Sequence, residues 1–205
     1  MELSNHHSIQ QIRDLLTTNK KIKLSDESKE KIMKCNAFLL SKVEDKNSII
    51  YGVNTGFGSL CNTKIAQKDL TQLQVNLIRS HACGMGDYVP YDIVSMMLLL
   101  KVKSLGYGYS GVQLETVEKL LDLYNTSTIP VIYEMGSLGA SGDLAPLSHM
   151  SLPLIGEGMV WSQDFKSIEK AKPSNLILGP KEGLALINGT QFMQAYGLCL
   201  SLIHI

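Results

Sequence analysis

The sequence has no excess of either charge. Its 205 residues contain 19 Lys and Arg against 19 Asp and Glu, which gives a formal net charge of zero. Proteins that coat nucleic acids or lie on anionic membranes carry surplus positive charge, so the composition argues against both classes. Hydrophobic residues make up 44% and charged residues 19%, which excludes intrinsic disorder. The apolar surplus predicts that part of the surface is covered by other protein.

Long apolar runs and paired cysteines are also missing. The densest apolar stretch, residues 93–100, is far shorter than the roughly 18 residues of a membrane-spanning helix. Residues 1–10 lack the apolar segment that defines a signal peptide. The 4 cysteines form no CxxC pair, and together with the 5 histidines they show no spacing typical of a metal site. We therefore expect a cytoplasmic protein with reduced thiols and no bound metal.

Apolar residues at helical spacing predict a mainly α-helical chain with a few short strands. Ser25 is expected to cap one helix, Pro90 to begin a second at a first-turn position and Ser110 to cap a third. Further helices are expected at residues 70–81, 143–151, 181–187 and 191–205, with an irregular segment or hairpin around Trp161. The helix over 191–205 is apolar on nearly every side, which is typical of a helix buried among others. This segment is expected to be either a hydrophobic tail or a helix of a larger protein of which the sequence is a part.

Residues 139–147 (GASGDLAPL) carry the most distinctive chemistry. Gly142 has no Cβ, so its nitrogen can closely approach the carbonyl of Ala140. Such an approach permits cyclisation with loss of water, and loss of the Ser141 hydroxyl would then leave an exocyclic methylidene. The product is an electrophile that no unmodified side chain supplies. On spacing alone, a loop-to-helix turn with a serine and an Asp143 cap remains the alternative.

Four segments in the same order resemble the histidine and aromatic amino acid ammonia-lyases. The run 136–149 (GSLGASGDLAPLSH) resembles the family signature, in which Ala-Ser-Gly becomes 4-methylidene-imidazol-5-one (MIO) autocatalytically. The other three are the N-terminal active-site loop 51–58 (YGVNTGFG), the selectivity helix 77–84 (LIRSHACG) and the asparagine segment 182–191 (EGLALINGTQ). The resemblance implies the N-terminal part of the L-aspartase/fumarase-like fold, with a glycine-rich MIO loop made from Ala140, Ser141 and Gly142.

The resemblance also implies roles for individual residues. Tyr51 would be a general acid/base for the β-proton if its pKa falls below the usual value of about 10; a tyrosine at a strand end is the alternative. Asn188 would hydrogen-bond MIO or the amino acid moiety of the substrate, unless it caps its own turn. Asp143 would cap the helix that follows it, whose N-terminal end faces MIO and stabilises negative charge there.

Ser80 and His81 bear on the substrate. The pair resembles the one found in the histidine enzymes, in which an imidazole hydrogen-bonds the substrate imidazole. At this position the phenylalanine enzymes typically have Phe-Leu, and many tyrosine enzymes have His-Leu. Ser-His at this position also resembles some bacterial tyrosine ammonia-lyases. Ala145-Pro146 looks more like the histidine enzymes. The implied activity is elimination of ammonia from L-histidine to trans-urocanate in histidine degradation, with tyrosine or phenylalanine as alternative substrates and neither metal nor dissociable cofactor.

The chain is much shorter than the family it resembles. We expect residues 1–205 to form the N-terminal MIO-bearing region of an ammonia-lyase, ending before the central helical bundle is complete. Family members are homotetramers whose active sites combine residues from three subunits. The later tyrosine, arginine and glutamate of the family have no counterpart here, so a catalytically silent fragment is the other alternative, and we expect no turnover from the 205-residue chain alone.

Overall fold

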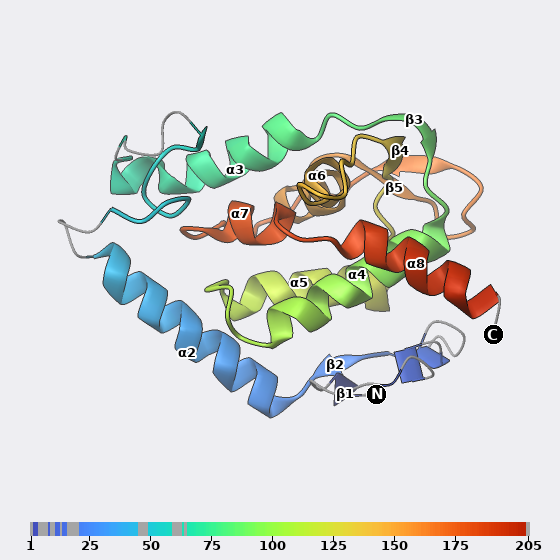
Figure 1. Ribbon diagram of the computed structural model, residues 1–205, viewed down its shortest axis with the longest axis horizontal. Coiled ribbons are helices and arrows are strands. Elements are labelled where there is room, and N and C mark those ends of the chain that lie inside the picture. The colour runs from blue at the N-terminus through green and yellow to red at the C-terminus, as the bar shows by residue number, and fades with distance from the viewer. Residues whose placement is uncertain are drawn as a thin grey trace.

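The computed structural model describes residues 2–3, 8, 11–12, 14–15, 21–44, 49–58, 63 and 65–203. Over these residues the chain is mainly helical with short strands (Figure 1), so the predicted mainly α class is confirmed. The helices are α2 (Asp26–Val43), α3 (Leu70–His81), α4 (Tyr91–Gly106), α5 (Leu114–Asn125), α6 (Leu144–Ser151), α7 (Glu182–Ile187) and α8 (Gln191–Ile203), with the 3₁₀ turns η2 (Gln67–Asp69) and η3 (Leu152–Ile155).

The strands form three separate pairs. β1 (Glu2–Leu3) and β2 (Lys23–Leu24) are parallel. β3 (Met85–Tyr88) and β4 (Tyr133–Met135) are antiparallel, and so are β5 (Met159–Trp161) and β6 (Ile168–Lys170). The last pair is the hairpin expected around Trp161.

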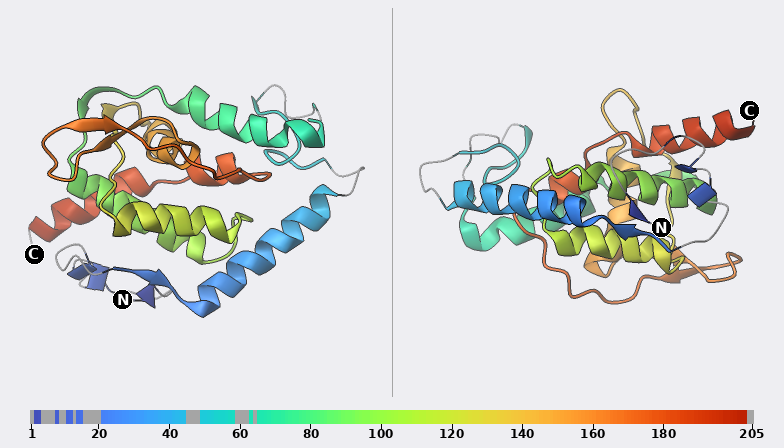
Figure 2. Two further views of the ribbon diagram at one scale, coloured as in Figure 1. Left: turned by 180° about the vertical axis from the view of Figure 1, so that it is seen from behind. Right: turned by 90° about the horizontal axis from the view of Figure 1, so that it is seen from below.

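Helix α4 forms the centre of the molecule. Residues 96–99 are all buried, so the helix is covered on every side and not along one stripe. It packs against α8 and α5, and α2 and α3 lie at opposite sides of the molecule (Figures 1 and 2). Helix α8 is only half covered: Phe192 and Ala195 are buried, whereas Met193 and Leu200 are more than half exposed. None of the helices in the described part of the chain is long and apolar enough to cross a bilayer.

Two of the predicted helix starts illustrate what local sequence can determine. Ser25 caps α2 as expected, because its Oγ accepts a hydrogen bond from the Ser28 nitrogen at 3.1 Å. The expected cap at Ser110 is wrong, since α5 begins at Leu114 without a side-chain cap from its own segment. A distant carboxylate satisfies this helix end: the nitrogen of Gln113 donates to Glu182 Oε1 at 3.0 Å.

Candidate functional site

The Ala-Ser-Gly segment lies at the tip of a tight turn between β4 and α6. The Gly142 nitrogen donates to the Gly139 carbonyl at 3.0 Å, and both glycines have left-handed backbones, with φ of 54° at Gly139 and 92° at Gly142. Ala140 and Ser141 between them are exposed. The turn therefore presents the serine hydroxyl to solvent and draws the backbone on either side of it together.

Asp143 anchors the base of this turn. Its side chain is completely buried, and its two carboxylate oxygens accept hydrogen bonds from Ser137 Oγ at 2.6 Å and from the Met193 nitrogen at 3.0 Å. The expectation that Asp143 caps α6 is wrong, because it makes no capping bond there. Its ψ of 51° lies outside the extended range that a capping residue adopts. The carboxylate instead caps the first turn of α8, a helix that begins far along the sequence.

The asparagine segment lies directly against the turn. The Asp143 nitrogen donates to the Gly189 carbonyl at 2.8 Å. A Cβ on Gly142 would lie only 3.2 Å from the same oxygen. Asn188 immediately precedes this contact at the C-terminal end of α7 and is exposed. Its side-chain amide makes no hydrogen bond to any residue that the structure describes, so it does not cap its own turn.

The turn also fits the modification that the family resemblance implies. Cyclisation requires the Gly142 nitrogen to reach the carbonyl carbon of Ala140, and the hydrogen bond from this nitrogen to the Gly139 carbonyl already folds the backbone into a turn around Ala140 and Ser141. A Cβ on Gly142 would make a tight contact of 3.2 Å with the Gly189 carbonyl oxygen, so the chain passes close to this oxygen. Ser141 is exposed, and its hydroxyl makes no hydrogen bond to any residue that the structure describes. The residues present can therefore hold an MIO group at this position.

Ser80 and His81 lie in the last turn of α3. His81 Nδ1 is 2.9 Å from the carbonyl of Leu77, and Ser80 Oγ donates to the same carbonyl at 3.0 Å. The two side chains are also in contact with each other, at 3.1 Å. This arrangement orients the His81 ring through Nδ1. It leaves Nε2 without a hydrogen bond among the described residues.

His149 of α6 connects the end of α3 with the Ala-Ser-Gly loop. Its Nε2 accepts a hydrogen bond from the Gly84 nitrogen at 3.0 Å, and its ring packs edge-on against Tyr133. Gly136, at the start of the loop, also packs on Gly84, because a Cβ added to Gly136 would lie 3.2 Å from the Gly84 Cα. The segment that follows α3, the loop and the last turn of α6 are thus joined by direct contacts.

Acid is expected to weaken this connection. Burial lowers the pKa of His149 from the usual 6.5, so the neutral ring is favoured in the folded state. The contribution of neutral His149 to the free energy of unfolding is therefore complete above pH 6.5. It is lost as the pH falls from 6.5 through the lowered pKa of the folded state. We expect the free energy of unfolding, measured with urea, to drop between pH 7.5 and pH 5.5. His149→Gln retains an acceptor that does not titrate, so its drop should be smaller; an equal drop would contradict the assignment.

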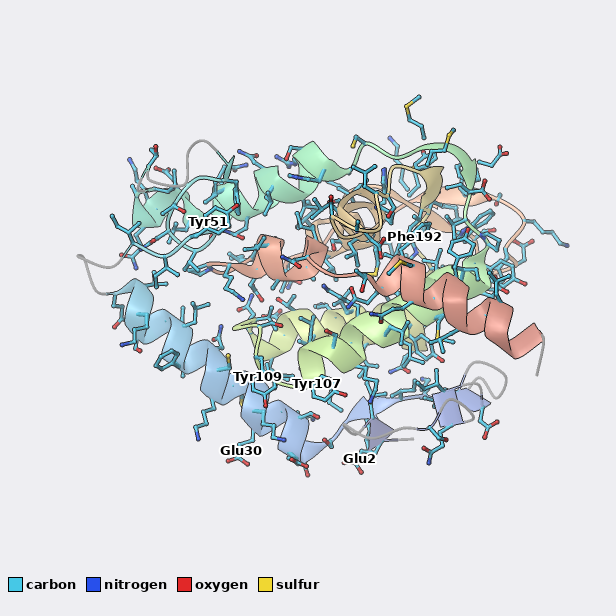
Figure 3. The ribbon with its side chains drawn as sticks, in the orientation of Figure 1. Glu2, Glu30, Tyr51, Tyr107, Tyr109 and Phe192 are labelled. Carbon is cyan, nitrogen blue, oxygen red and sulfur yellow. The ribbon has the colours of Figure 1, made fainter. Side chains whose placement is uncertain are left out.

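Tyr51 is not brought to the turn within this chain. Its side chain is 55% exposed, and its ring packs edge-on against Phe57, with the centroids 5.9 Å apart. The neighbouring Gly52 packs tightly on Leu184 of α7. In Figure 3, Tyr51 lies well away from Phe192, which stands in the first turn of α8. No hydrogen bond joins Tyr51 to Asn188 or to residues 139–142 in the part of the chain described.

Sequence reasoning missed two buried ionisable residues beside the site. Lys101 is 1% exposed in α4, and its Nζ donates to the Asn188 carbonyl at 2.9 Å. Glu182 is fully buried at the start of α7, and burial raises the pKa of its carboxyl. The signal for Lys101 is a cation placed directly after the apolar run 96–100 and before Val102. No local pattern indicates the partners of Glu182.

Comparison with known proteins identifies the family. The profile of the aromatic amino acid lyase family matches residues 7–203. The chain belongs to this family. Histidine ammonia-lyases of Streptococcus gordonii and of Streptococcus pyogenes serotype M5 are each 47% identical over 177 residues, which is 84% of this chain. The chain spans only 34% of their length.

Solved structures of aromatic amino acid lyase relatives have the same fold. Histidine ammonia-lyase from Trypanosoma cruzi superposes with a TM-score of 0.88 at 37% identity, over 98% of this chain and 40% of that one. Tyrosine aminomutase from Streptomyces globisporus gives 0.86 at 31% identity, over 97% and 38%. Ergothionase from Treponema denticola gives 0.90 at 26% identity, over 98% and 41%. The family resemblance read from the four motifs is confirmed.

Proposed function

We propose that this chain is the N-terminal, MIO-bearing region of a histidine ammonia-lyase, which eliminates ammonia from L-histidine to give trans-urocanate. The observation that carries the proposal is the direct contact between the Ala-Ser-Gly turn and the segment bearing Asn188, through the Asp143 nitrogen and the Gly189 carbonyl. Homology to histidine ammonia-lyases over 84% of the chain supports it. The chain spans about a third of the length of those relatives, so the complete activity is proposed only for a protein of their length.

The turn geometry supports formation of the prosthetic group from Ala140, Ser141 and Gly142. The Gly142 nitrogen attacks the Ala140 carbonyl carbon, and the resulting ring loses one water. Loss of the Ser141 hydroxyl with its α-proton releases a second water. Asp143 holds the base of the turn through Ser137 and Met193, which limits the backbone conformations open to the turn before the ring closes.

The group supplies an electrophile that activates the substrate amino group for departure. The protein residues bind and orient the substrate around it. The exposed amide of Asn188 can donate to the group or accept from the substrate amino acid moiety. His81, oriented through Nδ1 by Leu77 and Ser80, presents Nε2 to the substrate imidazole. A site that hydrogen-bonds the ring of its substrate discriminates strongly against a ring that leaves it unpaired.

Removal of the β-proton is assigned to Tyr51, acting between subunits. Tyr51 is exposed and distant from the turn of its own chain. In a homotetramer, of the kind implied by the family, Tyr51 of one copy would reach the turn of another. The exposed apolar residues Met193 and Leu200 on α8 support such an assembly, because they leave one side of this helix uncovered. The buried segments that hold the turn and Asn188 come from a single chain.

The test is product formation by the protein that contains this chain at its natural length. Addition of L-histidine is expected to raise the near-ultraviolet absorbance as urocanate forms, whereas L-tyrosine and L-phenylalanine should give a much slower rise. Preference for tyrosine or phenylalanine would shift the assignment to the corresponding ammonia-lyase. Absence of product from all three amino acids would contradict the ammonia-lyase proposal.

A further inference from the structure

Lys101 is a buried cation without an acidic partner. It lies in the centre of α4, next to the fully buried Val102 and two residues after the buried Leu99. Its Nζ donates to the main-chain carbonyl of Asn188 at 2.9 Å. None of the ion pairs found among the described residues involves Lys101. Burial of an ammonium without a counter-ion is energetically costly. The retention of Lys101 here therefore points to a role for its hydrogen bond.

Two charged residues, Lys181 and Glu182, lie where α7 begins. Lys181 donates to the carbonyl of Ser110, and its charge acts against that of Lys101. The carboxylate of Glu182 is held by the nitrogen of Gly179 and by both nitrogens of Gln113. Burial, and secondarily Lys181, lower the pKa of Lys101 to about 7. The ammonium is therefore partly deprotonated at neutral pH.

We propose that Lys101 is a positioning residue that fixes the Asn188–Gly189 segment against the Ala-Ser-Gly turn by holding the Asn188 carbonyl. Two successive carbonyls of this segment are then held from different elements. The Asn188 carbonyl is held by Lys101 of α4, and the Gly189 carbonyl by the nitrogen of Asp143. Gly189, with φ of 151°, lacks a side chain to restrict its own backbone. With both carbonyls fixed, only the side chain of Asn188 remains available to a ligand.

The role as a positioning residue rests on the proposed function, but the contact itself can be tested without activity. The sequence contains a single Asn-Gly pair, Asn188–Gly189. Labelling asparagine carbonyls with ¹³C and glycine nitrogens with ¹⁵N therefore gives one resonance for this peptide bond in an NMR experiment on the 205-residue chain. Because an ammonium donates a stronger hydrogen bond than an amine, the Asn188 carbonyl shift should titrate with Lys101.

We expect a transition in the Asn188 carbonyl shift with a midpoint near pH 7 in the unmodified chain. Lys101→Met should remove the transition, since a residue of similar length without a charge replaces the cation; such replacements of buried charges are often neutral for stability. Lys103→Met is the matched control, because Lys103 lies on the same helix and its Nζ lies over the Tyr107 ring. This variant should keep the transition. If the Asn188 carbonyl shift of Lys101→Met matches that of the unmodified chain at every pH, the contact is overturned.

A second readout separates this inference from the proposed function. In the protein of natural length, Lys101→Met is expected to lower kcat about tenfold with little change in KM, and to remove the limb of the pH profile near pH 7. If the carbonyl transition is lost but kcat and the pH profile are unchanged, Lys101 holds the backbone without positioning the site. Mass spectrometry of the tryptic peptide 120–166, which contains residues 140–142, tests the MIO proposal independently. If this peptide from the protein without substitutions has the mass calculated from its sequence, the MIO proposal fails. The NMR result still decides whether Lys101 contacts the Asn188 carbonyl.

Discussion

Replacement of Ser141 by alanine is expected to abolish turnover while leaving the fold unchanged. The methylidene carbon of the electrophile derives from the serine side chain, so an alanine in its place can lose the cyclisation water but not the second one. Removal of a covalent catalytic group costs on the order of 10⁴- to 10⁶-fold in kcat. Ser141 is exposed and makes no hydrogen bond to any described residue, so folding does not depend on it.

Urocanate formation and thermal melting measure these two effects separately. Ser41→Ala is the matched control: Ser41 is also exposed, and its Oγ bonds only to the Phe38 carbonyl within α2. It should retain full activity. Activity of Ser141→Ala within tenfold of the unmodified protein would rule out a serine-derived electrophile. A large drop in its melting temperature would instead assign Ser141 a structural role.

Asp143→Ala is expected to produce the largest loss of stability in the site. The buried carboxylate accepts one hydrogen bond from a hydroxyl and one from a backbone nitrogen. Hydrogen bonds to a charged group contribute roughly 1.5–3 kcal/mol each, so loss of both should lower the free energy of unfolding by about 3–6 kcal/mol. The first turn of α8 and the base of the Ala-Ser-Gly turn would both lose their anchor, so MIO formation should fail as well.

Asp164→Ala provides the comparison. Asp164 also accepts from a hydroxyl and a backbone nitrogen, those of Ser162 and Lys166, but at an exposed position. Urea unfolding of the two variants at pH 7 therefore isolates the effect of burial. Asp164→Ala should change the free energy of unfolding far less than Asp143→Ala. Equal losses would mean that the Asp143 contacts do not hold the site together.

The sequence predicted those parts of the structure that depend on neighbouring residues. Helical spacing indicated α3 and α8, and Ser25 indicated the start of α2, because a cap and its helix are contiguous in the chain. The four family motifs indicated which segments would form a site. Three of them, at the end of α3, at residues 136–149 and after α7, are connected in the structure through Gly84, Gly136 and Gly189.

The contacts that hold the site come from residues far apart in sequence, and no local pattern encodes them. Asp143 precedes α6 yet caps α8, and Glu182 begins α7 yet holds the start of α5. Lys101 on α4 reaches a carbonyl at the end of α7. Each pairing depends on how the helices pack around α4. Tyr51 belongs to a motif that resembles the active-site loop of the family, but no hydrogen bond joins it to the turn among the described residues, so the role proposed for it requires a second copy of the chain.

Mass spectrometry of the tryptic peptide 120–166, which contains residues 140–142, tests the central claim most directly. The two condensation steps remove two waters from this peptide. We predict that it is lighter than its unmodified sequence by the mass of two waters, and that fragmentation confines the loss to Ala140, Ser141 and Gly142. A peptide from the natively folded protein with the full unmodified mass would contradict the account.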